Sequence, residues 1–278
     1  MLKEVVESKL VSHEFYLGDN VSILENHVED GFVDLTVTSP PYDDLRSYNG
    51  FEWNLDGVIE QLWRVTKDGG VVVWVVGDKT HKRSETGSSF RTALKFMGYG
   101  WRLHDTMIYA KTNPVPLTHN RYEQQFEYMF IFSKGKPKTF NGIRVPTKTA
   151  GSRTNRKIKA REYDKEAVRS RHEVTVTKED KLLTNIWYYS VGTASASDKL
   201  ARKHPAFFPE DLAYDHIVSW SNIGDVVLDL FGGSGTVAKM SEKTHRNSIY
   251  IDISDEYLDL AKERLLEFKN ENLHEEEL

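Results

Sequence analysis

The sequence predicts an α/β fold with a mostly parallel central sheet, and three observations support this prediction. Short apolar runs alternate along the 278 residues with segments whose apolar side chains recur at helical spacing. Residues 71–76 are five valines and Trp74, an all-apolar run that is typical of a central strand covered on both faces. Residues 229–236, Asp-Leu-Phe-Gly-Gly-Ser-Gly-Thr, form a glycine-rich junction between a predicted strand and a predicted helix.

The first half of the chain is expected to alternate strands and helices. A strand that ends at Thr38 runs directly into Ser39-Pro40-Pro41. Because two prolines cannot continue a central strand, we expect the chain to leave the sheet there. Gly69-Gly70 is expected to end the first long helix, and Ser88 or Ser89 to cap the next one. The predicted strands are 14–17, 32–38, 71–76, 102–111 and 127–133, and the predicted helices are 55–68 and 88–97.

The second half closes with another alternation of helices and strands. Ser254 is expected to cap the last helix, because apolar residues on one helical face follow it. The acidic residues 274–278 are expected to form a frayed tail. The predicted elements are a helix at 209–221, a strand at 225–230, a helix at 236–244, a strand at 248–252 and the last helix from 255.

Residues 139–197 differ from the rest of the chain in composition. They are rich in Lys, Arg, Thr and Asn and have weak periodicity, which predicts an insertion outside the main core. The chain is thus divided into residues 1–138, 139–197 and 198–278. Between Lys134 and His172, thirteen Lys or Arg stand against three Asp or Glu, although the whole chain has a net charge of −5. Such a concentration of positive charge is typical of proteins that bind a polyanion, although a solvated loop would also explain it.

The composition excludes several kinds of site. The chain has no cysteine, so disulfides, cysteine-ligated zinc and thiolate nucleophiles are impossible. The histidines form no HExxH-like pair, and we predict no metal site. The longest clear apolar run, residues 71–76, is far shorter than the roughly 20 residues of a membrane-spanning helix. The N-terminus lacks the pattern of a signal peptide, so we expect a cytoplasmic protein that does not contact a membrane.

The glycine-rich junction is typical of a site for a nucleoside-bearing cofactor. Residues 233–238 satisfy the GxGxxA form of the dinucleotide-binding fingerprint. The next predicted strand ends at Asp252, where a carboxylate can accept hydrogen bonds from ribose hydroxyls. The Gly-Lys-Ser/Thr of a phosphate-binding P-loop is missing. Taken alone, this pattern does not name the cofactor, and tight packing would also explain the glycines.

Ser39-Pro40-Pro41-Tyr42 is the second motif that indicates chemistry. The two prolines stiffen the loop and remove two N–H donors, so the backbone there offers only acceptors. Ser39 adds a side-chain acceptor, and Tyr42 offers a flat stacking face. Acceptors beside an aromatic ring suit an –NH2 group on a planar heterocycle. A rigid proline turn with no such role is the alternative reading of this motif alone.

The motifs together resemble those of DNA amino-methyltransferases of the β order, in which the catalytic loop precedes the cofactor loop. The match depends on their joint order and extends over most of the chain. It argues against a nicotinamide-dependent dehydrogenase, which the glycine loop alone would allow. Two positions depart from the typical family pattern: this chain has Leu230 where the family often has proline, and Asp252 where it often has glutamate. Both changes preserve the required chemistry. The motifs are Gly18-Asp19, Thr38–Tyr42, Lys203–Pro209, Asp229–Thr236 and Asp252.

The resemblance implies a Rossmann-like fold dependent on S-adenosylmethionine, circularly permuted and carrying an inserted target-recognition region at 139–197. It implies that the glycine loop wraps the methionine part of the cofactor, that Asp252 holds the ribose and that Asp19 lies nearby. The implied catalytic residues are Ser39, Pro40, Pro41 and Tyr42. The implied cofactor-binding residues are Asp19, His204, Pro205, Phe207, Asp229, Phe231, Gly233, Ser234, Gly235, Thr236 and Asp252.

The implied reaction is direct methylation of an exocyclic amino group in double-stranded DNA. Ser39 Oγ and the Pro40 carbonyl would each accept one N–H, and Tyr42 would stack on a base flipped out of the helix. Methylation at cytosine C5 is excluded, because it needs a cysteine nucleophile. In the family, Ser at the first loop position accompanies mainly N4-cytosine enzymes, so we predict cytosine N4, with adenine N6 as the alternative.

Other functions remain as alternatives at this point. Similar Pro-Pro-Tyr loops methylate RNA or a protein glutamine, although those families usually place the cofactor loop first. An inactive DNA-binding module with a methyltransferase fold is a further alternative, which both intact loops disfavour. The resemblance also allows a homodimer and a separate cognate restriction endonuclease. The recognition sequence does not follow from these motifs.

Overall fold

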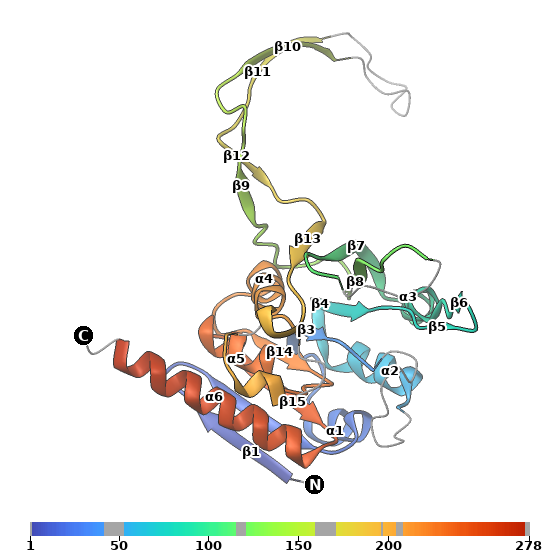
Figure 1. Cartoon of the computed structure of the whole chain (residues 1–278), viewed down its shortest axis with the longest axis vertical. Helices are drawn as coiled ribbons and strands as arrows, with labels where there is room; N and C mark the ends of the chain where they lie inside the picture. The colour runs from blue at the N-terminus through green and yellow to red at the C-terminus, as the bar shows by residue number, and fades with distance from the viewer. Residues whose placement is uncertain are drawn as a thin grey trace. The chain divides into compact units, whose positions relative to one another are not determined.

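The computed structural model describes residues 2–41, 53–114, 121–158, 171–195, 197–203 and 208–275 (Figure 1). The chain divides into two compact units. The larger unit combines Met1–Asn141 with Asn185–Leu278, and the smaller unit is Gly142–Thr184. Among the described residues, no helix is long and apolar enough to cross a membrane.

The larger unit is built on a sheet whose nine described strands follow the order β1-β2-β15-β14-β3-β4-β8-β7-β13. From β2 to β4 neighbouring strands are parallel, whereas β1 and β8 pair antiparallel with their neighbours. The predicted mostly parallel α/β sheet is therefore confirmed. The strands are β1 (Leu2–Glu7), β2 (Ser12–Leu17), β3 (Val33–Thr38), β4 (Thr66–Val76), β7 (Arg102–Lys111), β8 (Phe126–Ser133), β13 (Ile186–Tyr189), β14 (Val226–Asp229) and β15 (Asn247–Asp252).

Helices cover both faces of this sheet, which gives three layers (Figure 1). On one face α5 and α6 pack on β2 and β15 through Phe15, Tyr250 and Leu258. On the other face α1, α2 and α3 pack on a larger apolar core that contains Trp74 and Phe132. The helices are α1 (Asn20–His27), α2 (Leu55–Val65), α3 (Ser88–Gly98), α4 (Glu210–Trp220), α5 (Thr236–Lys243) and α6 (Asp255–Glu275).

The valine run forms the centre of the sheet, as predicted. All of residues 71–76 are buried, with β3 on one side and β8 on the other. The Trp74 ring lies 5.1 Å from that of Phe96 on α3, and Phe96 stacks on Phe132 at 4.2 Å between ring centroids. Burying large side chains on both faces removes much apolar surface from water, which makes β4 a rigid base for the loops at its ends.

Two local predictions were wrong, each because a contact distant in sequence decides the local structure. Gly69-Gly70 does not end the helix, since α2 ends at Val65 and β4 already begins at Thr66. Both glycines lie inside that strand, where Gly69 N donates to the Lys134 carbonyl at 2.6 Å and the Gly70 carbonyl accepts from Lys134 N at 3.1 Å. Neither Ser88 nor Ser89 caps α3. The N-cap is Gly87, with a φ of 65°, and the Ser89 N–H instead donates to Asp78 at the end of β4.

Residues 139–197, the predicted insertion, are divided between the two units, and their role as a target-recognition region stays a prediction. Residues 142–184 form the smaller unit, with two antiparallel strand pairs in its described part. Residues 186–189 belong to the larger unit, where β13 pairs in parallel with β7 at the edge of the sheet. The paired strands of the smaller unit are β9 (Arg144–Pro146) with β12 (Asp180–Leu182), and β10 (Arg153–Ile158) with β11 (Arg171–Val176).

Candidate active site

The predicted motifs meet at one edge of the sheet. Because β2, β15, β14 and β3 are parallel neighbours, the residues that follow them emerge side by side. Hydrogen bonds join each loop to the next. Gly18 N donates to the Asp252 carbonyl at 2.9 Å, and Thr38 Oγ1 donates to Asp229 Oδ1 at 2.7 Å. Thr236 Oγ1 also donates to the Phe208 carbonyl at 3.3 Å, so the structure brings together described parts of all five motifs.

The glycine loop is shaped by close packing as well as by its backbone. Gly235 has a φ of 75° and is the N-cap of α5, a conformation that favours glycine. A Cβ on Gly232 would lie 2.1 Å from the Tyr250 ring, and one on Gly235 would lie 2.6 Å from the Ala261 Cβ. Tyr250 also donates its hydroxyl to the Gly233 carbonyl at 2.8 Å. The loop is thus held tightly against β15 and α6.

Asp252 is held by the backbone at the end of β15. Its Oδ2 accepts from Gly233 N at 2.8 Å and its Oδ1 from Ser254 N at 2.9 Å. Burial raises the pKa of Asp252, and these backbone donors oppose that rise. Each carboxylate oxygen can accept more than one hydrogen bond, so the group retains acceptors for hydroxyls.

Asp229 is the most perturbed carboxyl group at this edge. Burial raises its pKa to about 7, and hydrogen bonds from Thr38 and from Phe231 N oppose the rise, while nearby Asp252 adds to it. Both hydrogen bonds reach Oδ1, at 2.7 and 3.2 Å. A positively charged group beside this carboxylate would favour its ionised form.

The other predicted residues are placed as follows. Asp19 is exposed and caps α1, with Oδ1 accepting from Ser22 N at 2.9 Å. Ser39 is half-buried and Pro40 is buried, directly after β3. Phe231 packs edge-on against Trp53, with 5.2 Å between ring centroids. Tyr42, His204, Pro205 and Phe207 lie outside the described residues and stay predictions.

Comparison with known proteins decides the family. The chain matches the DNA methylase family over residues 33–263. The chain belongs to this family. It is 54% identical over 245 residues to the orphan methyltransferase M.BamHII of Bacillus amyloliquefaciens, and the match covers 87% of this chain and 92% of that protein. The predicted resemblance to DNA amino-methyltransferases is confirmed.

Solved structures support the same fold. The PvuII DNA methyltransferase, described as cytosine-N4-specific, matches with a TM-score of 0.65 at 18% identity, covering 93% of this chain and 91% of that one. A putative DNA modification methylase from Thermus thermophilus, solved with S-adenosylmethionine, matches with a TM-score of 0.62 at 25% identity, covering 91% and 93%. The predicted Rossmann-like methyltransferase fold is confirmed, and S-adenosylmethionine is confirmed as the cofactor of the family.

Sequence reasoning missed two polar residues at this edge of the methylase. The Asp78 carboxylate, after β4, accepts hydrogen bonds from Thr86, Ser88 and Ser89. Burial alone would raise the pKa of Asp78, but these hydrogen bonds lower it below its usual value. Asn20 is buried beside the glycine loop, and its Oδ1 has no hydrogen-bond partner among the described residues. For Asp78, its position just after a predicted central strand was a signal in the sequence that could have indicated a role at this edge. No pattern in the sequence indicated that Asn20 is buried there.

Proposed function

We propose that this DNA methyltransferase transfers the methyl group of S-adenosylmethionine to the N4 amino group of cytosine in duplex DNA. The observation that carries the proposal is Ser39, followed by two donor-free prolines, at the end of β3 beside the cofactor loop. The solved PvuII methyltransferase, described as cytosine-N4-specific, has the same fold and supports the choice of cytosine. Direct transfer needs no covalent enzyme intermediate, which fits a chain without cysteine.

The described residues fit the cofactor. S-adenosylmethionine supplies an activated methyl group on a sulfonium and carries a further positive charge on its amino group. We assign Asp229, with its raised pKa, to the positively charged methionine part, together with Phe231 and the turn Gly233–Thr236. We assign Asp252 to the ribose hydroxyls and Asp19 to the neighbouring wall. His204, Pro205 and Phe207 complete the proposed pocket.

The catalytic loop acts on the target amino group. Its nitrogen is a poor nucleophile because the lone pair is delocalised into the ring. Ser39 Oγ and the Pro40 carbonyl each accept one N–H, which favours a pyramidal nitrogen with its lone pair toward the methyl group. Pro41 keeps this stretch rigid, and Tyr42 stacks on the flipped base. The surplus proton passes to solvent.

We assign DNA recognition to residues 139–197, and within them to the smaller unit. Cationic residues between Lys134 and His172 supply contacts to phosphates, which position a protein on duplex DNA. Acting on DNA, the enzyme would work in the cytoplasm. M.BamHII is named an orphan methyltransferase, which favours an enzyme without a cognate endonuclease over one with it. A homodimer stays a proposal from the family resemblance.

The nucleoside products test this proposal. Plasmid DNA methylated by the protein is digested to nucleosides, and N4-methylcytosine is separated from N6-methyladenine by mass spectrometry. We expect N4-methylcytosine only. Detection of N6-methyladenine alone would show that adenine, not cytosine, is the target. The role of Ser39 would stay the same, because both amino groups demand the same geometry of it.

Ser39→Ala tests the role of the loop in the same assay. We expect normal cofactor binding with a methylation rate lowered by about 10²-fold or more, as for the loss of one transition-state hydrogen bond. Calorimetry with S-adenosylmethionine provides the control for binding. Full activity of the variant would contradict the assigned role of Ser39, and absence of both binding and methylation in the wild type would leave an inactive DNA-binding module.

A further inference from the structure

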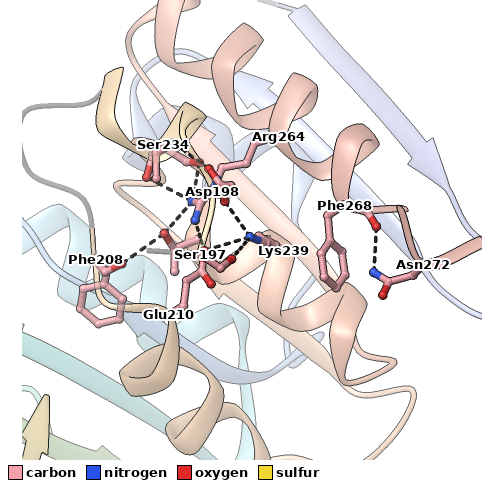
Figure 2. A network of polar contacts seen from close by, with 11 residues as sticks. Ser197, Asp198, Phe208, Glu210, Ser234, Lys239, Arg264, Phe268 and Asn272 are labelled. Atoms are coloured by element: carbon pink, nitrogen blue, oxygen red, sulfur yellow. Dashed lines mark hydrogen bonds and ion pairs between the residues drawn. The ribbon is translucent and has the colours of Figure 1, made fainter. Parts of the chain in front are cut away.

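Two buried, positively charged side chains lie next to the cofactor loop, residues 229–236. Lys239 on α5 and Arg264 on α6 have side chains only 4% and 1% exposed. Both contact the same two carboxylates, Asp198 and Glu210 (Figure 2). Lys239 Nζ lies 2.6 Å from Asp198 Oδ2 and 2.9 Å from Glu210 Oε1, and Arg264 Nε lies 2.7 Å from Asp198 Oδ2. Charges are thus balanced within the cluster.

The Arg264 guanidinium uses its three nitrogens for three different parts of the chain. Nε donates to Asp198 and Nη2 to Glu210. Nη1 donates to the Ser234 carbonyl at 3.0 Å and to Thr236 Oγ1 at 2.8 Å, both in the cofactor loop. A planar fork with five donors can satisfy these directions at once, whereas the ammonium of a lysine cannot.

The two carboxylates flank, in the sequence, a second part of the proposed pocket. Asp198 precedes residues 204–207 and Glu210 follows them. Asp198 also accepts from Ala201 N at 2.8 Å, which fixes the chain next to it. Thr236 Oγ1 in turn donates to the Phe208 carbonyl at 3.3 Å. The cluster therefore connects the glycine loop to both flanks of residues 204–207.

We infer that Arg264 and Lys239 are positioning residues that hold the turn at Ser234–Thr236 and the flanks at Asp198 and Glu210 in one fixed arrangement for cofactor binding. The inference rests on the proposed function, which assigns both segments to S-adenosylmethionine. Buried ion pairs are an inefficient means of stabilisation, because desolvation offsets most of the attraction. Their value here is geometric, since preorganised contacts raise affinity by reducing the ordering that binding requires.

Arg264→Lys tests the inference, and Arg246→Lys is its matched control. Arg246 is also buried, 7% exposed, and also donates to backbone carbonyls and a serine, but its partners are Ser221 and Thr244, outside the proposed pocket. We expect Arg264→Lys to weaken S-adenosylmethionine binding by about tenfold, with methylation at saturating cofactor within about threefold of wild type. Arg246→Lys should lower the melting temperature but keep the dissociation constant within about twofold.

Asp198→Asn provides a second variant in case Arg264→Lys does not fold. Asp198 Oδ2 contacts both cations, whereas Ala201 N donates to Oδ1, an acceptor that asparagine keeps. An effect of this substitution on cofactor binding is therefore expected to pass through the two cations. Unchanged binding in the folded variants, or an equal loss in Arg246→Lys, would overturn the inference. A wild-type protein that does not bind S-adenosylmethionine would overturn the proposed function, and the inference with it.

Discussion

Asp229 shows at the scale of one residue how a buried carboxyl group affects stability. Burial raises the pKa of its carboxyl to about 7, whereas in the unfolded chain it is near 4. Between these values the folded protein holds a proton that the unfolded chain has released. The free energy of unfolding therefore falls as the pH rises through this window, and the loss is complete above pH 7.

Replacing Asp229 by Asn should remove this titration. We expect the variant to gain stability relative to wild type, on the order of 2–3 kcal/mol, between about pH 5 and pH 8. Urea unfolding of both proteins across this range measures the difference. Saturating S-adenosylmethionine should flatten the pH dependence of the wild type, because a cationic ligand favours the ionised carboxylate. If the wild type and the variant, both without cofactor, lose stability with pH in parallel, the titration does not belong to Asp229.

At the scale of elements, the turn between β14 and α5 depends on its contact with β15. Gly232 has an ordinary φ, but a Cβ there would overlap the ring of Tyr250, which is 1% exposed. Gly232→Ala should therefore lower the free energy of unfolding by about 1–3 kcal/mol through overpacking. Gly98→Ala is the control, because the Cβ there meets no atom within 4 Å and the residue ends a helix. Denaturant unfolding that ranks the two variants equally would refute the packing argument.

The elements that the sequence could predict are those whose signal is local. The valines of β4 and the prolines after β3 have local effects on conformation, and the glycines after β14 mark the change from strand to helix. That the loops meet at one edge of the sheet follows from the parallel order of the strands. Contacts between distant residues were not predictable in this way. Asp78 replaces the expected serine cap of α3, and Gly69 and Gly70 lie inside β4, where they exchange backbone hydrogen bonds with Lys134.

The Arg264 cluster of Asp198, Glu210, Lys239 and Arg264 is a further case, because it joins residues from four separate segments of the sequence. These segments have ordinary local patterns, and only the packing of α4, α5 and α6 in the folded chain brings the four side chains together. Charged residues on helices usually face solvent, and no local pattern marks Lys239 and Arg264 as buried. Burial and pairing become evident only from the tertiary structure.

At the scale of the whole molecule, the division into two units separates two proposed tasks. The residues on either side of the smaller unit, Asn141 and Asn185, are held by backbone hydrogen bonds within the larger unit. Asn141 N donates to the Ser219 carbonyl at 2.8 Å, and Ile108 N donates to the Asn185 carbonyl at 2.8 Å. The larger unit contains every described residue that we assign to the cofactor and to the transfer step. Removing the smaller unit should therefore weaken DNA binding and methylation more than it weakens cofactor binding.

Replacing residues 142–184 by a flexible linker of about ten glycines and serines tests this separation. We expect S-adenosylmethionine binding by calorimetry to stay within about twofold of wild type, because the sheet and the Arg264 cluster are untouched. Methylation of plasmid DNA should fall by about 10²-fold or more, and the salt dependence of DNA binding should become shallower as phosphate contacts are lost. Undiminished methylation would place recognition in the larger unit. Loss of cofactor binding in a folded variant would show instead that the smaller unit supports the pocket.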